Sequence, residues 1–322
     1  MIRIAIIGMG LIGTSLGMAL RNADPKESPL GPLEVIGFDR EPRVTREARG
    51  RLAIDREART LADAVREAQI VVIATPVRAI QDVFRDLASH LPAGTIVTDV
   101  ASTKAQVCRW AADLLPATVA FVGGHPMAGR EQSGPGAADP DLFRNAIYCL
   151  TATSTTPAHA VEAVEALVRT VGAKPYYIDP EEHDAYVAGI SHLPLLLSVG
   201  LVTTTGNSPA WKEMAPLAAT GFRDVSRLAS GDPQMQRDIL LTNPHGLTRW
   251  IDEFIRFLVT AREQIAAGDV AAIEQMLEQA KATRDAWLAS KPHLRPGEAE
   301  FTNLPTVERP SLIGFRWPKR EK

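Results

Sequence analysis

A glycine motif near the start of the chain limits what the first part of the protein can fold into. Gly8, Gly10 and Gly13 form a G-x-G-x-x-G pattern between the apolar run Ile2–Ile7 and the helical pattern Leu11–Arg21. There the first glycine allows a tight turn, the second admits a pyrophosphate, and the third lets helix and strand pack closely. The helix N-terminus favours the anion. The motif predicts a Rossmann domain that binds a dinucleotide through Gly8, Gly10, Leu11, Ile12 and Gly13.

The kind of dinucleotide depends on Asp39 and Arg40, which follow the apolar run Leu33–Phe38. A carboxylate here accepts hydrogen bonds from the adenine ribose and repels a 2′-phosphate, so Asp39 favours NAD and makes NADP the lesser expectation. Arg40 weakens this argument, because arginine can hold a phosphate or stack on adenine. A solvated Asp-Arg pair without a cofactor role stays open. Thr75 and Pro76 follow a later strand at the ligand-binding edge and are further cofactor candidates.

The order of apolar runs and helical patterns predicts two domains. In the first half they alternate as β-α-β units, which indicates a doubly wound, mostly parallel α/β sheet over residues 1–179. From residue 180 to 290 only helical patterns occur, and their apolarity suggests an all-α domain that pairs with a second copy. Residues 291–322 are expected to form an extended tail. The expected strands are Ile2–Ile7, Leu33–Phe38, Ile70–Ala74, Thr95–Val100, Ala120–Val122, Ala146–Thr151 and Lys174–Ile178. The expected helices of the second domain are Val187–Thr205, Trp211–Ala219, Pro233–Leu241, Leu247–Ala267 and Val270–Leu288.

Charge and cysteine content exclude several classes of function. A net charge of −3 gives no general basic field for nucleic acid. Cys108 and Cys149 lie in no metal-ligand spacing, so we expect core thiols in a reducing compartment and no metal site. The longest apolar run, Leu193–Val202, is too short to span a bilayer and predicts a buried helix. With no room for a signal peptide before the glycine motif, we expect a cytoplasmic protein without a membrane partner.

Several side chains are candidates for chemistry. His125 lies in a Gly/Pro loop at the ligand edge of the sheet and suits acid-base work, although a structural histidine is an alternative. Taken alone, Ser102 is a helix N-cap and Lys104 a solvated helix residue. His192 lies in an apolar run typical of a core histidine. Arg223 and Arg227 share a helix face, which suits either carboxylate recognition or a solvated surface.

Five segments, in this order, resemble the prephenate/arogenate dehydrogenase family over Met1 to Leu288. The segments are Gly8–Gly13, Thr98–Lys104, Gly124–Gly129, Ser191–Pro194 and Gly221–Arg227. The Gly-His-Pro-Met-Ala-Gly and Ser-His-Leu-Pro segments are far more specific than the glycine motif. The resemblance implies a Rossmann domain, a helical domain that forms a homodimer, and an active site between the two.

The resemblance also implies roles for individual residues. His125 corresponds to the catalytic histidine, bonded to the ring hydroxyl of the substrate, and Ser102 to a residue that contacts that histidine beside the nicotinamide. His192 corresponds to a substrate-pocket residue and Arg227 to the one that binds a substrate carboxylate, with Arg223 assisting. Glu131 matches an acidic position at the pocket edge. A neutral Gln234, where an acidic residue would pair the amine of arogenate, favours prephenate.

The implied reaction is the oxidative decarboxylation of prephenate to 4-hydroxyphenylpyruvate in L-tyrosine biosynthesis. Hydride passes to NAD and the hydroxyl proton to His125, so the rate should rise with pH through one titration between about 6 and 8. The stretch after Leu288 is shorter than a regulatory ACT domain, so we expect no feedback control by that route. No segment of the sequence corresponds to chorismate mutase, so we expect no such fusion. The alternatives are an arogenate or dual-specificity cyclohexadienyl dehydrogenase, a β-hydroxyacid dehydrogenase relying on Lys212, and a non-catalytic NAD-binding regulator.

Overall fold

One eight-stranded sheet forms the N-terminal part of the computed structural model, which describes residues 1–290. The strand order is β3-β2-β1-β4-β5-β6-β7-β8. The strands are β1 Ile2–Ile7, β2 Leu33–Phe38, β3 Arg56–Glu57, β4 Ile70–Ile73, β5 Ile96–Asp99, β6 Ala120–Pro126, β7 Ile147–Thr151 and β8 Lys174–Tyr177. All neighbouring strands are parallel except β6 and β7. Because β1 pairs with both β2 and β4, the chain reverses its direction of winding beside β1, where such sheets bind ligands.

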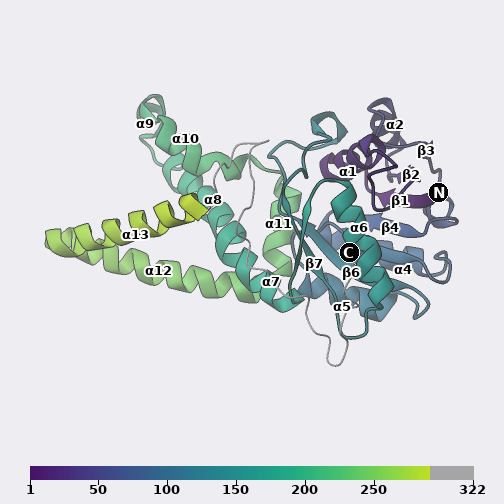
Figure 1. Ribbon diagram of the computed structural model, residues 1–322. Helices are drawn as coiled ribbons and strands as arrows, with labels where there is room; N and C mark the ends of the chain where they lie inside the picture. Colours follow the sequence, from purple (N-terminus) through teal and green to yellow (C-terminus); the bar gives the residue numbers. More distant parts are fainter. Residues whose placement is uncertain (291–322) are drawn as a thin grey trace.

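Helices cover both faces of this sheet (Figure 1), which explains why most of its strands are continuous apolar runs. Buried residues of α1 (Leu11–Asn22), α2 (Pro42–Gly50) and α6 (Ala158–Thr170) belong to one core cluster. Buried residues of α3 (Leu61–Val65), α4 (Ile80–Ala88) and α5 (Ala105–Leu114) belong to the cluster of the opposite face. The predicted fold class, a Rossmann-type sheet followed by a helical domain, is confirmed.

From Pro180 onward every element up to residue 290 is a helix or helical turn. Two long helices, α12 and α13, lie side by side and extend away from the sheet (Figure 1). The elements are α7 Pro180–Val187, η3 Ala188–His192, α8 Leu193–Gly206, α9 Trp211–Met214, η4 Ala215–Leu217, α10 Thr220–Ser226, η5 Arg227–Ser230, α11 Pro233–Thr242, α12 Pro244–Ala267 and α13 Val270–Ser290. The expected tail, 291–322, lies outside the described residues.

The expected single helix Val187–Thr205 differs most from the structure. The helix starts earlier, at Pro180, because the Asp179 carboxylate accepts hydrogen bonds from the N–H groups of Glu181 and Glu182. One π-helical turn, η3, interrupts it, and α8 follows with Pro194 in its first turn. Such π-turns are frequent at functional sites. The expectation of a buried helix is wrong for the single chain, where most residues of α8 are partly exposed.

The combined run Pro180–Gly206 is long and apolar enough to cross a membrane by length and composition, with 33% of its most apolar window buried. A core helix of a soluble protein passes the same test, so this one run is weak evidence for a membrane. Its partly exposed apolar side chains are typical of a surface that packs against another protein.

Candidate active site

A cavity of about 610 Å³ lies where the carboxyl end of β6 meets η3, α8 and α11. It brings together five residues that the sequence singled out for chemistry or substrate binding: Ser102, His125, Glu131, His192 and Arg227. Leu11 and Ile12, at the start of α1, also line it, so the glycine motif and these side chains share one space. Segments far apart in the sequence therefore converge on one site, between the sheet and the helical part of the chain.

The structure does not bring Arg223 or Gln234 to this cavity. Arg223 is exposed on α10, and its guanidinium Nε donates to Asp224 Oδ1 over 3.0 Å. Gln234 is exposed on α11, one residue before Met235, which does line the cavity. An acidic residue lines it nearby: Asp232, whose carboxylate accepts a hydrogen bond from the N–H of Met235. Among the described residues, neither Arg223 nor Gln234 lines the cavity, and their contacts with a substrate stay predictions.

The glycine turn has the shape that a dinucleotide requires. Gly8 has φ +99°, and a Cβ there would lie 2.6 Å from the carbonyl oxygen of Ala74, so no other residue fits easily. A Cβ on Gly13 would collide with the Gly8 carbonyl. A Cβ on Gly10, in contrast, would meet no atom within 4 Å, so open space lies beside the N-terminus of α1. Gly10 is the N-cap of α1 and supplies no side-chain cap, so the helix N–H groups remain available to an anion.

Asp39 follows β2, and its side chain contacts the glycine turn. Its Oδ2 accepts from the N–H of Met9 at 2.9 Å and its Oδ1 from the N–H of Glu41 at 3.0 Å, which fixes the carboxylate after β2. A second hollow of about 450 Å³ adjoins it. That hollow is lined by Asp39, Pro42, Thr45, Arg46, Arg49, Glu57, Ala58 and Arg59. These residues fit the adenosine half of a dinucleotide, with the carboxylate available to ribose hydroxyls. Arg40 is exposed and does not line the hollow.

Thr75 follows β4, next to Ala74 and the glycine turn. The following element is a 3₁₀ turn, η1 Val77–Ala79, with Pro76 at its N-cap and no side-chain cap. The buried Thr75 hydroxyl has no hydrogen-bond partner among the described residues. A buried hydroxyl without a partner is costly, and a bound ligand would satisfy it.

His125 is held by a partner that the sequence did not identify. Its Nδ1 lies 2.9 Å from Nε2 of His183, a residue of α7 that is only 1% exposed. His125 itself is 9% exposed and lines the cavity. Burial, followed by the charges of His183, Lys104 and His192, lowers the pKa of His125 well below its usual value. His125 is therefore neutral at physiological pH and able to accept a proton.

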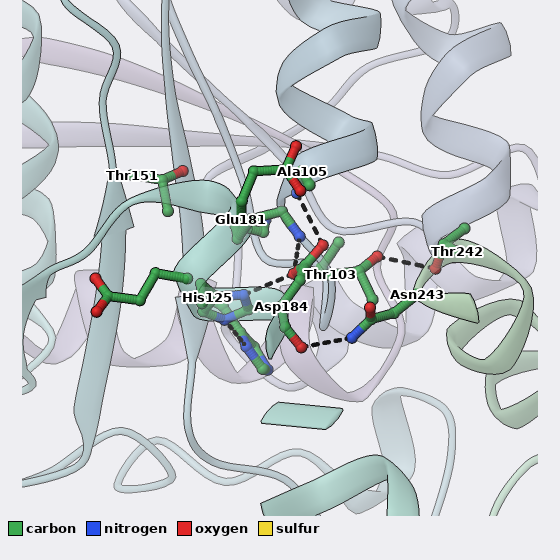
Figure 2. Close-up of polar contacts among 12 residues, drawn as sticks. Thr103, Ala105, His125, Thr151, Glu181, Asp184, Thr242 and Asn243 are labelled. Carbon is green, nitrogen blue, oxygen red and sulfur yellow. Dashed lines mark hydrogen bonds and ion pairs between the residues drawn. The ribbon is translucent and has the colours of Figure 1, made fainter. Parts of the chain in front are cut away.

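Figure 2 shows Asp184 joined by dashed lines to Ala105 and Asn243. Asp184 also connects His183 to this part of the site. Its Oδ1 lies 2.8 Å from Nδ1 of His183 and accepts from the N–H of Lys104 at 2.7 Å. Its Oδ2 accepts from the N–H of Ala105 at 3.0 Å. The carboxylate thus caps α5 from another part of the chain, the role that the sequence alone assigned to Ser102.

His192 is oriented by Asn243, at the start of α12. The amide nitrogen of Asn243 donates to the carbonyl oxygen of Asp184 at 2.6 Å and lies 3.3 Å from Nδ1 of His192. As the nitrogen is a donor, Nδ1 of His192 must accept, and the ring hydrogen is then on Nε2. That Nε2 is buried and has no partner among the described residues. Burial lowers the pKa of His192 to about 4. His192 thus offers a neutral N–H donor at the cavity wall.

Lys104 is fully buried, so the expectation of a solvated lysine is wrong. Its Nζ forms an ion pair with Asp99 and donates to the carbonyl oxygen of Gly124 at 2.6 Å. Asp99 also accepts from the N–H groups of Ala101 and Gly124, at 2.9 and 3.1 Å. This ion pair ties the end of β5 to the strand that carries His125. The local sequence does not reveal this ion pair, because Asp99 ends an apolar strand and Lys104 lies in the polar segment that follows it.

Arg227 and Ser102, two further candidates from the sequence, both line the cavity. Arg227, in η5, forms an ion pair with Glu131, so the cavity holds a guanidinium whose present partner is a single, partly exposed carboxylate. Ser102 lines the cavity, but no hydrogen bond joins it to His125 in the described part of the chain. The contact between Ser102 and His125 that the resemblance implies therefore stays a prediction, and His183 is a further partner of His125.

Two family models and curated relatives match the sequence of this chain. The family model "Prephenate dehydrogenase, nucleotide-binding domain" matches residues 18–177, and "Prephenate dehydrogenase, dimerization domain" matches residues 179–279. The chain is 37% identical to the prephenate dehydrogenase of Bacillus subtilis (strain 168) over 287 residues, 88% of this chain and 75% of the relative.

Solved structures of prephenate and arogenate dehydrogenases are similar to this chain over most of its length. The crystal structure of prephenate dehydrogenase from A. aeolicus in complex with hydroxyphenyl propionate and NAD+ matches with a TM-score of 0.81 at 27% identity, covering 89% of this chain and 98% of the other. The crystal structure of Synechocystis arogenate dehydrogenase matches with a TM-score of 0.74 at 30% identity, covering 89% and 100%.

Proposed function

The chain belongs to the prephenate dehydrogenase family, and from that premise we propose that its cavity oxidises and decarboxylates prephenate, with His125 as the proton acceptor. Family membership makes it an NAD-dependent oxidoreductase of tyrosine biosynthesis. The observation that carries the proposal for His125 is its position: a neutral, buried imidazole on the wall of the cavity that the start of α1 also lines.

The residues present fit NAD. The open space at Gly10, the uncapped N-terminus of α1 and the carboxylate of Asp39 would hold its pyrophosphate and adenine ribose, with the Thr75 hydroxyl and Pro76 farther along the same edge. Bound NAD supplies the hydride acceptor. The protein's part is to bind and orient the substrate and to take its proton.

His125 is proposed to take up a proton and later to return it. The C–H bond that breaks is on the ring carbon that carries the hydroxyl group. Its hydrogen leaves with the bonding pair, as hydride, while the hydroxyl proton moves to Nε2 of His125. Loss of carbon dioxide leaves its bonding pair in the ring, which becomes aromatic as a phenolate. The proton held on His125 can then return to the phenolate oxygen. A buried neutral imidazole suits both steps, since it takes up the proton reversibly.

Arg227 and His192 are proposed to bind the substrate. A guanidinium is suited to a carboxylate, and Arg227 can exchange its bond to Glu131 for one to the substrate. The unpartnered Nε2–H of His192 would donate to a second oxygen, which would remove the cost of leaving it buried and unsatisfied. Ser102 is proposed to lie beside the nicotinamide.

A spectrophotometric assay of NADH formation tests the proposed function. We expect turnover with prephenate, and a higher kcat/KM for prephenate than for arogenate. The reason is that Gln234 is neutral where an acidic residue would pair with the amine of arogenate, and the nearby Asp232 carboxylate already caps α11. Higher efficiency with arogenate would make the chain an arogenate or cyclohexadienyl dehydrogenase. Turnover of neither substrate would refute the function itself.

The β-hydroxyacid dehydrogenase alternative depends on Lys212, the one lysine in the middle of the helical domain. Lys212 is exposed on α9 and does not line the cavity, so the geometry does not support that alternative. A non-catalytic NAD-binding regulator would leave the buried, oriented histidines of the cavity unexplained.

Asp39 should make the enzyme prefer NAD. We expect kcat/KM at least about tenfold higher with NAD than with NADP, because the fixed carboxylate would lie against the 2′-phosphate. Asp39→Ser removes the charge and should shrink that ratio, helped by the nearby Arg46, Arg49 and Arg59. Equal efficiencies in the wild-type enzyme would contradict this role of Asp39.

We also propose a cytoplasmic homodimer, with the division between the two domains at residue 179. Large apolar side chains remain exposed on α12 and α13: Trp250, Ile255, Phe257, Leu258, Ile265, Val270 and Leu277. Their exposure exceeds what a soluble monomer normally leaves uncovered, and the matched family model describes this region as a dimerization domain. Light scattering at micromolar concentration should give twice the chain mass of 34.8 kDa. A monomer would contradict the proposal.

A further inference from the structure

His183 is a buried titratable side chain to which the proposed reaction assigns no part. It lies on α7 behind the cavity wall and does not line the cavity. Both of its ring nitrogens are nevertheless engaged, Nε2 with His125 and Nδ1 with Asp184. The two imidazole rings meet edge to face, with centroids 5.1 Å apart. A side chain placed between a carboxylate and the proposed proton acceptor can control where the hydrogens lie.

The hydrogen positions follow from the fixed end of this chain of contacts. The Asp184 carboxylate accepts N–H groups from Lys104 and Ala105, which can only donate. Its Oδ1 must likewise accept from His183, so the hydrogen of His183 lies on Nδ1. With this one hydrogen on Nδ1, His183 has a lone pair on Nε2, and that lone pair accepts the Nδ1 hydrogen of His125. Nε2 of His125 is left with a free lone pair.

This free lone pair is where the proposed reaction needs it. Nε2 of His125 makes no hydrogen bond to any described residue, and it is not among the fully buried polar atoms without a partner. With the opposite tautomer, Nε2 would carry a hydrogen. It could then donate to the hydroxyl oxygen but could not accept the hydroxyl proton. Held by Asn243, His192 has the opposite arrangement and is a donor. Both histidines are oriented by residues joined to Asp184.

We propose that His183, fixed by Asp184, is a positioning residue that holds His125 in the tautomer with its hydrogen on Nδ1 and its basic lone pair facing the cavity. This inference rests on the proposed role of His125. The positioning depends on the hydrogen-bond acceptor at Nε2 of His183 and not on the volume of the ring. Substitutions that keep an acceptor at that point should therefore differ in kcat from those that remove it.

Two substitutions of His183 make the distinction. His183→Gln places a carbonyl oxygen near the position of Nε2 and keeps the acceptor for His125, whereas His183→Leu fills similar space without one. We expect His183→Leu to lower kcat by about 10²-fold, the order by which correctly placed general bases contribute. His183→Gln should retain most of the activity. The KM for prephenate and the affinity for NAD should change little in either variant, because His183 does not itself line the cavity or belong to the glycine turn.

The controls separate this inference from the proposed function. His90→Leu replaces an exposed histidine after α4 and should leave kcat and the melting temperature unchanged. If His125→Asn abolishes turnover while folded His183→Leu stays near native, the positioning role is overturned and the role of His125 stands. If His183→Gln and His183→Leu lose activity equally while both still melt like the wild type, an acceptor at this point is not what matters. If His125→Asn is active, the proposed role of His125 itself fails.

A measurement on the wild-type enzyme keeps the inference testable even if His183→Leu does not fold. In ¹⁵N-histidine-labelled protein, the ring signals of His125 are identified as those lost in His125→Asn. Their ¹⁵N shifts distinguish the two neutral tautomers. We expect the hydrogen on Nδ1. A hydrogen on Nε2 in the folded enzyme at neutral pH would overturn the proposal.

Discussion

Replacing His125 with asparagine will lower the turnover number by about 10²–10⁴-fold, the usual contribution of a general base. Asparagine keeps a hydrogen-bonding group opposite His183 but cannot take the hydroxyl proton. NAD affinity should barely change, because the glycine turn and Asp39 are separate from this side chain. Steady-state kinetics with prephenate and a direct binding measurement for NAD would check both statements.

Arg227→Ala is the matched comparison for His125→Asn. It should chiefly raise KM, because a carboxylate is bound in the ground state and the transition state alike. Near-native turnover in His125→Asn, or a variant that fails to bind NAD, would show that His125 is structural.

The pH dependence of turnover will differ from the expectation based on sequence. An unperturbed imidazole predicted a rise between about pH 6 and 8. Burial lowers the pKa of His125 well below 6.5, with the charges of His183, Lys104 and His192 acting in the same direction. The neutral, active form therefore persists to lower pH. We expect kcat to be flat from pH 6 to 8 and to fall only as the solution becomes more acidic, through the lowered pKa.

Replacing Lys104 with methionine will destabilise the fold by about 3–5 kcal/mol, the usual cost of removing one partner of a buried ion pair. Asp99 would remain buried without its cation, and the Gly124 carbonyl would lose its donor. The free energy of unfolding in urea measures the effect, with the NADH assay reporting any change at His125.

An exposed ion pair provides the control for Lys104→Met. Lys281→Met breaks the contact between Lys281 and Asp285 on α13, where both side chains are at least half exposed, and should cost less than about 1 kcal/mol. The double variant Asp99→Leu/Lys104→Met should recover part of the loss, because no unpaired charge remains. A Lys104→Met enzyme as stable as the wild type would show that water reaches Asp99 in solution.

Much of the sheet could be predicted because parallel strands that are buried on both faces have nearly continuous apolar sequences. β1 and β2 have the expected bounds, and most of the others differ by a residue at an end. β3 was missed because Arg56–Glu57 is short and charged. β6 is longer than expected, since Gly123–Pro126 pair with the antiparallel strand β7, and no local pattern encodes that pairing.

The site was predictable only where specific motifs mark it. Ser102, His125, Glu131, His192 and Arg227 do line one cavity. His183 and Asp184 were missed, because in the run Asp179–Tyr186 they look like polar residues of an ordinary helix start. The cap signal Asp179-Pro180 could have placed the start of α7 correctly. Nothing in the local sequence reveals that His183 is buried, because burial there comes from contacts with distant segments.

The capping of α5 by Asp184 has a consequence for dividing or recombining this enzyme. An excised N-terminal domain would retain the glycine turn and His125, yet it would lose the carboxylate that caps α5 and the ring that orients His125. Such a fragment should hold the dinucleotide without being able to regain activity from a helical domain taken from a relative, unless that domain carries the same His-Asp pair in register. The two halves are thus not interchangeable parts, because the reactivity of one is set by the other.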